Sequence, residues 1–325
     1  MMNAIDKLKK YILDGSIGEL DLRNCALMNL SLEGVDLSNI NFEGADLTNS
    51  SLQFVNLSNT NLSSACLVNC NLFDVNLSGT NLSHTNLTNS DLNFVKLDGA
   101  NMTEAILNGV SFAGVNLSES NIIGLNLSNV DFSGTDQSVA NFTGLNLSLS
   151  NFTDAEFSNS NLSYANLNET ILTRTKFYNS NLSFAKLINA NKWGVGGMTI
   201  EELCESGADF CQANLTGADL SFANFGEASF DYSNLSKAQL FKTNLGYSHL
   251  RGAKFIEANL EQAILMSANL FEADLTNANL TNANLTKATL VDALIDGANL
   301  KGANLSEVNY SDKWWDYSNN WWENS

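Results

Sequence analysis

Side chains able to perform acid–base, nucleophilic or metal chemistry are few and scattered along this chain of 325 residues. His84 and His249 are its two histidines, and neither has a nucleophile or a metal ligand at a spacing that known sites use. The five cysteines include no CxxC pair and no neighbouring histidine cluster, so they indicate neither a zinc site nor a disulfide framework. No glycine-rich phosphate loop occurs. The sequence therefore predicts a protein that is not an enzyme, with no catalytic residue, no cofactor and no metal.

The net charge is strongly negative, because 35 acidic residues outnumber 16 basic ones and give −19 at pH 7. A negative surface repels nucleic acid and favours a basic protein partner, although the same charge can serve only to keep the protein soluble. No apolar run approaches the ~18 residues of a membrane span, and the N-terminal residues lack the pattern of a signal peptide. We therefore expect a cytoplasmic protein with reduced thiols, and neither nucleic acid nor a membrane as its partner.

The element that must position these residues is a five-residue repeat. Leu or Phe recurs at almost every fifth residue from Leu22 to Leu187, and Gln137 is the only polar residue at these central positions. A second array runs from Phe210 to Leu305 or Tyr310, shifted in phase by three residues. Proline is absent, as expected of stacked strands whose backbone N–H groups are all needed.

Each repeat reads as one short strand followed by a corner. A small or β-branched residue stands two places before each central residue, for example Val55 before Leu57 and Ala213 before Leu215. Side chains two apart share one face of a strand, so both point inward. The other three positions carry Ser, Thr, Asn, Gly and Asp, which favour tight turns.

Four such sides complete one coil, because like residues recur at intervals of twenty. One column holds Val35, Val55, Val75, Val95 and Val115, and another holds Leu at every step from Leu47 to Leu187. The predicted fold is all-β, a quadrilateral parallel β-helix of about 13 coils.

Units such as Ala165-Asn166-Leu167, the GADLT around Leu47 and the run Thr276–Leu290 resemble the pentapeptide-repeat family. The resemblance implies a right-handed winding of the quadrilateral β-helix. The opening segment, Asn3 to Leu27, is similar to the short helical cap of bacterial, especially cyanobacterial, members.

This pattern divides the chain into five predicted segments: a helical cap (1–19), a first β-helix block (20–190), a loop-helix interruption (191–209), a second block (210–310) and a tail (311–325). In the cap, Ile5, Leu8, Ile12 and Leu13 should share one face of a helix spanning about Ala4 to Leu13. We expect this helix to cover the first coil, the alternative being a helix that binds a membrane surface or a partner.

The interruption and the tail each allow two interpretations. In the interruption, a helix capped by Thr199 and Glu202 is either an insertion at a corner or part of an angled boundary between blocks, with Trp193 and Leu203 filling the joint. The tail either folds over the last coil of a monomer or makes a two-fold homodimer contact. Its aromatic residues are Trp314, Trp315, Tyr317, Trp321 and Trp322.

Three outward aromatic residues, Phe54, Phe73 and Phe94, fall on neighbouring columns of one side. They are either a docking patch or ordinary exposed aromatics, and Asp74 lies on the same column as Phe54 and Phe94.

Two functions fit these features. The first is a non-catalytic structural or protein-interaction scaffold with flat, polar, acidic faces. The alternative, implied by the resemblance, is a DNA mimic that occupies the DNA site of a type II topoisomerase such as gyrase. Against the alternative, the acidic residues fall on several columns without a continuous stripe, among them Asp46, Asp74, Asp91, Glu104, Asp131, Glu156 and Glu169.

Gln137 is the one conflict within the core pattern. It shares a column with Leu117 and Phe157, where an unpaired amide costs roughly 1 to 3 kcal/mol. We therefore expect that Gln137→Leu raises the melting temperature.

Overall fold

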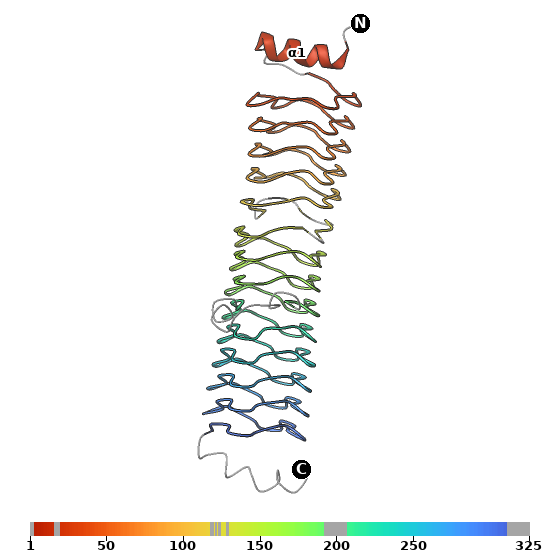
Figure 1. Ribbon diagram of the computed structural model, residues 1–325. Coiled ribbons are helices and arrows are strands. Elements are labelled where there is room, and N and C mark those ends of the chain that lie inside the picture. The colour runs from red at the N-terminus through yellow and green to blue at the C-terminus, as the bar shows by residue number, and fades with distance from the viewer. Residues whose placement is uncertain are drawn as a thin grey trace. The chain divides into compact units, whose positions relative to one another are not determined.

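The computed structural model describes residues 3–15, 20–117, 120, 122, 125–127, 130–191 and 207–310. Helix α1 (Ala4–Asp14) is the one helix among them, and the β structure consists of isolated parallel bridges rather than named strands. The chain forms two compact units: unit 1 is Met1–Ala140 with Leu145–Asn151, and unit 2 is Asn141–Gly144 with Phe152–Ser325. Within each unit the backbone climbs through stacked coils (Figure 1).

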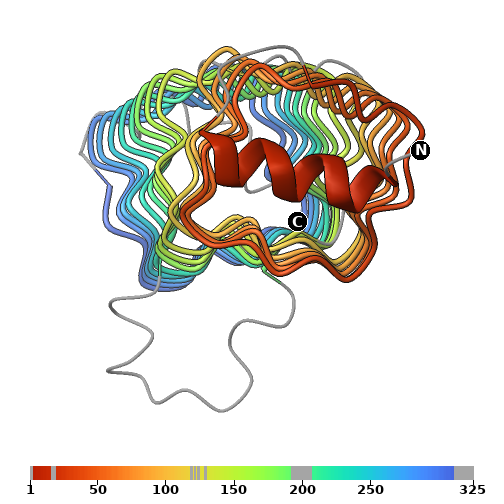
Figure 2. The ribbon, with the colours of Figure 1, turned by 90° about the horizontal axis from the view of Figure 1, so that it is seen from above.

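The bridges confirm the twenty-residue period. In unit 1 the columns include Asn41↔Asn61 and Asn61↔Asn81, and in unit 2 they include Asn259↔Asn279, Ile264↔Asn284 and Asn269↔Thr289. Bridges recur every five residues along most of the described chain, so one coil contributes four of them and has four sides, which can be followed in the view along the coils (Figure 2). The residue just before each central residue makes the bridge, and it is called the bridge residue below.

The core contains the residues that the repeat predicts. The Leu column from Leu47 to Leu187 and the Val column from Val55 to Val115 are buried. Phenylalanines at central positions stack on one another from coil to coil: the ring centroids of Phe112 and Phe132 lie 5.5 Å apart in unit 1, and those of Phe210 and Phe230 lie 4.7 Å apart in unit 2. Burial of these side chains supplies the main driving force for stacking the coils.

Corners are tight turns whose second inner residue has a left-handed backbone. In the repeat centred on Phe42, the N–H of Ala45 donates to the carbonyl of Phe42 over 2.9 Å, and the residue between them, Gly44, has φ +65°. Together with the absence of a positive φ at Glu43, this combination is typical of a type II turn. The residue two places after each central residue is called the corner residue below, and every corner residue that the structure describes, from Asn24 to Glu307, has a positive φ. Asn is frequent there because its side chain tolerates this conformation better than most.

The outer surface is held flat by amide side chains of the bridge residues. Asn56 donates from Nδ2 to Oδ1 of Asp36 over 3.0 Å, and its own Oδ1 accepts from Nδ2 of Asn76 over 3.1 Å. The same Oδ1 atom accepts from the N–H of Ser58 in the following turn, also over 3.1 Å. One Asn therefore fixes both the stacking of the coils and the turn after it, which explains why Asn dominates this position.

Helix α1 lies across the open end of unit 1, as the cap prediction requires (Figure 2). Asn3 caps its N-terminus by accepting from the N–H of Asp6 over 2.8 Å, and Gly15 ends it with φ +56°. Leu8 is buried, but Leu13 is 84% exposed, so the prediction that Leu13 belongs to the covering face was wrong. At 100° per residue, Leu13 lies about 140° around the helix from Leu8, outside the apolar stripe.

The coils on either side of the interruption pair directly. Bridges Lys176↔Asp209, Asn181↔Asn214 and Lys186↔Asp219 join residues 33 apart, thirteen more than elsewhere. Thirteen additional residues shift the five-residue phase by three, which is the shift between the two arrays. Trp193, Thr199, Glu202 and Leu203 lie outside the described residues, so their roles and the five-segment division stay predictions.

Gln137 overturns the expectation of an unpaired buried amide. Its side chain is fully buried, its Oε1 accepts from the N–H of Leu117 over 2.9 Å, and its Nε2 donates to the carbonyl of Val115. In most coils such backbone groups pair with a bridge residue of the next coil, for example the N–H of Leu57 with the carbonyl of Asn76, but no bridge joins Asn116 to Asp136 in the described part of the chain. The amide thus replaces two ladder hydrogen bonds, and the premise for a stabilising Gln137→Leu change was wrong.

Candidate interaction surface

The corner position sets the direction of the outward aromatic side chains. Phe54 and Phe94 are corner residues, each with φ +60°, and Phe73 stands one place before a corner. Because the inward positions belong to the central and small residues, rings at the corner point away from the core. Phe54 is 46% exposed and Phe94 is 52% exposed. A left-handed backbone is itself unusual for residues as bulky as these.

The three rings form one continuous row, called the aromatic corner below. Ring centroids of Phe54 and Phe73 lie 5.8 Å apart and those of Phe73 and Phe94 lie 5.4 Å apart, both edge to face. The ring of Phe94 then covers Gly114 in the next coil, where a Cβ atom would stand 2.5 Å from its Cδ1. The residues named from the sequence are therefore in contact, while their role in binding stays a prediction.

The surroundings of the aromatic corner are acidic. Asp74 is the exposed corner residue between Phe54 and Phe94 on their column. Residues 20–140 contain only Arg23 and Lys96 as basic residues. Against them stand twelve acidic residues: Asp21, Glu33, Asp36, Glu43, Asp46, Asp74, Asp91, Asp98, Glu104, Glu119, Asp131 and Asp136. Most of the uncompensated negative charge of the β-helix therefore lies in unit 1.

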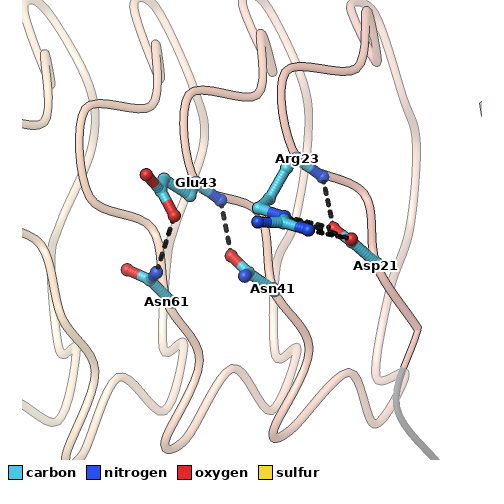
Figure 3. Close-up of polar contacts among 5 residues, drawn as sticks. All are labelled: Asp21, Arg23, Asn41, Glu43 and Asn61. Atoms are coloured by element: carbon cyan, nitrogen blue, oxygen red, sulfur yellow. Dashed lines mark hydrogen bonds and ion pairs between the residues drawn. The ribbon is translucent and has the colours of Figure 1, made fainter.

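The polar face near the start of unit 1 shows how its few charges are arranged (Figure 3). Arg23 binds Asp21, with 2.7 Å between Nη2 and Oδ2. The hydrogen bonds from Arg23, side chain first and backbone second, lower the pKa of Asp21 to about 2. The N–H of Glu43 donates to Oδ1 of Asn41, and Nδ2 of Asn61 donates to Oε2 of Glu43 over 3.5 Å. These groups are hydrogen-bonded and either exposed or half-buried, which suits a surface rather than a reactive site.

Among its described residues, unit 2 carries three further outward aromatic clusters that sequence reasoning missed. Tyr164 and Phe184 stack with centroids 5.1 Å apart, and Phe184 covers Gly217. Phe222 meets Phe241 edge to face at 5.4 Å. The rings at corner residues could have been found from the sequence, because each is an aromatic residue two places after a central residue. In two cases, Phe184 and Tyr232, a Gly occupies the same corner of the next coil.

The third cluster consists of Tyr232 and Phe271, and there the chain supplies its own cation. A second cation lies beside the cluster of Phe222 and Phe241. The guanidinium of Arg251 lies 5.9 Å from the ring centroid of Tyr232 and 5.2 Å from that of Phe271, and it also pairs with Glu272 at 3.7 Å. The ammonium of Lys242 lies 5.1 Å from the centroid of Phe241. Cations over aromatic faces are stabilised by the ring quadrupole.

The groups considered for chemistry stay apart in the structure. Nδ1 of His84 lies 3.2 Å from Oε2 of Glu104 with both side chains more than half exposed, and His249 is exposed on another coil. Burial is the main cause that raises the pKa of the thiols of Cys70 and Cys211, each to about 11. Among the described residues no group of three or more His, Cys, Asp or Glu side chains could hold a metal ion.

The C-terminal aromatic residues cannot be placed in the same way. Trp314, Trp315, Tyr317, Trp321 and Trp322 lie outside the described residues, so a cap or a dimer contact stays a prediction. In the part of the chain that is described, no helix has both the length and the apolar character to cross a membrane.

Comparisons with solved structures found several similar chains. HetL, a pentapeptide repeat protein involved in heterocyst differentiation regulation from the cyanobacterium Nostoc sp. strain PCC 7120, is 25% identical over 96% of this chain and 98% of its own, with a TM-score of 0.27. A pentapeptide repeat protein from the Arabidopsis thaliana thylakoid lumen is 30% identical over 33% of this chain and 75% of its own, with a TM-score of 0.32. QnrB1, a plasmid-mediated fluoroquinolone resistance protein, is 18% identical over 89% and 93%, with a TM-score of 0.25.

No curated protein sequence matches the chain. Two family models show the family to which it belongs. A model of a pentapeptide repeat region matches residues 45–122. A model of pentapeptide repeats in eight copies matches residues 21–63, 140–168, 155–191, 206–231, 233–271 and 273–309. These ranges cover most of both arrays, and the chain belongs to the pentapeptide repeat family.

Proposed function

We propose that this protein is a non-catalytic scaffold that binds another protein through the flat, polar, acidic faces of its β-helix. The observation that supports this most is the chain of amide hydrogen bonds along the bridge columns, as between Asp36, Asn56 and Asn76. The outward side chains of these bridge residues keep the face of the β-helix flat and regular. Such a preformed surface loses little conformational entropy when a partner binds.

Several finer features belong to the same proposal. The winding is right-handed with about 13 coils, as the family resemblance implies. The protein acts in the cytoplasm, either as a monomer whose tail (311–325) covers the last coil or as a homodimer joined at its C-terminal end. In both cases the side faces of unit 1 stay available to a partner.

The test is to identify a partner and rebuild the complex from pure components. Affinity capture from the native host names candidates, and each is then purified and titrated against this protein by calorimetry. The proposal expects saturable binding with a defined stoichiometry and no chemical change in either protein. Candidates that bind only in the lysate, or a partner that is chemically modified on binding, would refute it.

The alternative, a DNA mimic for a type II topoisomerase, is favoured by one observation, the concentration of acidic residues in unit 1. A protein surface that mimics DNA must present carboxylates at regular intervals. Here the bridge column containing Asp36 continues with Asn56, Asn76 and Lys96, so charge is not continuous along it. Gyrase supercoiling, measured with this protein added at micromolar concentration, tests this alternative. If the protein neither inhibits gyrase nor protects it from a gyrase-targeting drug, the alternative is eliminated.

A further inference from the structure

Unit 2 shows how this fold completes an outward aromatic cluster. At the corner of Tyr232, the guanidinium of Arg251 lies over two rings, with the carboxylate of Glu272 within 3.7 Å of it. At the neighbouring cluster, the ammonium of Lys242 lies over Phe241. A cation over an aromatic face thus occurs twice on this surface, and at Arg251 a carboxylate also pairs with the cation.

The aromatic corner of unit 1 has the rings and the carboxylate but not the cation. Phe54, Phe73 and Phe94 contact one another, and Asp74 stands between two of them on their column. Within the described residues no Lys or Arg side chain lies over these rings. Lys96 follows Phe94 by two residues, but it is a bridge residue on the next side of the coil.

We propose that the aromatic corner, together with Asp74, binds an arginine or lysine side chain presented by a basic segment of the partner protein. This inference rests on the proposed scaffold function and names the chemistry of its partner. The guanidinium or ammonium group would lie over the ring faces and pair with the Asp74 carboxylate, as Arg251 does within unit 2.

The charge of unit 1 selects this occupant. Twelve acidic residues against two basic ones in residues 20–140 attract a basic segment and steer its approach. Nucleic acid and anionic membrane surfaces would be repelled by the same field. An apolar partner without positive charge would gain from the rings but would leave Asp74 unpaired.

The probe is a fluorescent nine-residue peptide with three arginines separated by glycine and serine, compared with the same peptide carrying uncharged citrulline. Anisotropy titrations at 150 mM salt measure the dissociation constants. The triple variant Phe54→Ala, Phe73→Ala, Phe94→Ala should bind the arginine peptide about tenfold more weakly, and Asp74→Asn about threefold more weakly. Asp74→Asn keeps a residue suited to the left-handed corner, so it tests the site even if the triple variant loses stability.

Matched controls separate this site from general charge attraction. Tyr164→Ala, Phe184→Ala removes an aromatic pair of similar exposure that has no carboxylate between its rings, and Asp98→Asn removes an exposed charge on another column. Both should change the dissociation constant less than about twofold. Equal weakening in the controls, equal binding of the citrulline peptide, or no binding by the unmodified protein would each overturn the inference. The scaffold function is judged separately, by whether the purified native partner still binds the triple variant and Asp74→Asn.

Discussion

The ring of Phe94 covers Gly114 so closely that a Cβ atom there would stand 2.5 Å from the ring's Cδ1. Gly134, one coil later at the same corner, has nearly the same backbone, φ +65° against +70°, but open space around it. Both alanine substitutions carry the same left-handed strain of about 1 kcal/mol. Gly114→Ala should cost about 1–2 kcal/mol more than Gly134→Ala, because the Phe94 ring must move.

Thermal unfolding followed by circular dichroism measures this difference. The double variant Phe94→Ala, Gly114→Ala supplies the control, since removal of the ring should bring the effect of Gly114→Ala down to that of Gly134→Ala. Equal melting temperatures for the two single variants would show that the ring does not rest on the corner.

The repeat made the core predictable from the sequence, because one physical rule applies in every coil. Leu57 and Val55 are two apart and turn inward together, and the interval of twenty identifies their stacking partners. Leu13 was misplaced because the apolar stripe of a short helix was read too broadly, although the angle of 100° per residue excludes it. The phase shift of three residues between the arrays also had a simple origin, the thirteen added residues between paired coils.

The candidate site was predictable only in part. Period alone brought Phe54, Phe73 and Phe94 to one side, but the cation over the Tyr232 ring depends on the side-chain direction of Arg251, which no spacing rule gives. Similarly, the sequence shows a polar residue, Gln137, at a central position, which suggested an unpaired buried amide. It does not show which backbone groups lack a partner in the β-ladder and can bind that amide.

The pair of Asp21 and Arg23 predicts a pH dependence at the first coil (Figure 3). Hydrogen bonds from Arg23 lower the pKa of Asp21 from 3.8 to about 2 in the folded protein. A lowered folded-state pKa means that the pair stabilises the fold above about pH 4 and that this contribution is lost as the pH falls through about 2. Since both side chains are exposed, the effect on stability is small, and the titration itself is the better measurement.

Carboxyl-detected NMR of Asp21 should therefore show a pKa near 2 in the unmodified protein and a clearly higher one in Arg23→Gln, still below 3.8 because the backbone N–H of residue 23 continues to donate to Asp21. Arg251→Gln, a change in unit 2, should leave the Asp21 titration as it is. An Asp21 midpoint that does not respond to Arg23→Gln would contradict the assigned cause.

Cys70 should be an inert thiol in the native state. Burial, its largest perturbation, raises its pKa to about 11, so about one thiol in a thousand is ionised at pH 8. Iodoacetamide at pH 8, followed by peptide mass spectrometry, should leave Cys70 unlabelled in folded protein and label it after unfolding in guanidinium chloride. Rapid native labelling of Cys70 would show that the coils around it open readily, and Cys70→Ser, which should not alter labelling elsewhere, checks the site assignment.

Gln137→Leu should lower the melting temperature, contrary to what its place among buried leucines suggests. The amide satisfies the N–H of Leu117 and the carbonyl of Val115, and Leu would leave both groups buried without a partner. We expect a net loss of about 1–3 kcal/mol, since the apolar transfer gained by Leu offsets only part of that cost. Gln137→Met, which keeps the length of the side chain but not its hydrogen bonds, should be destabilised similarly, whereas Leu107→Met at an ordinary central position should change stability by less than about 1.5 kcal/mol. If either Gln137 variant melts at or above the temperature of the unmodified protein, the backbone groups of the two coils can pair with each other directly. The Gln137 amide would then not be needed to satisfy them.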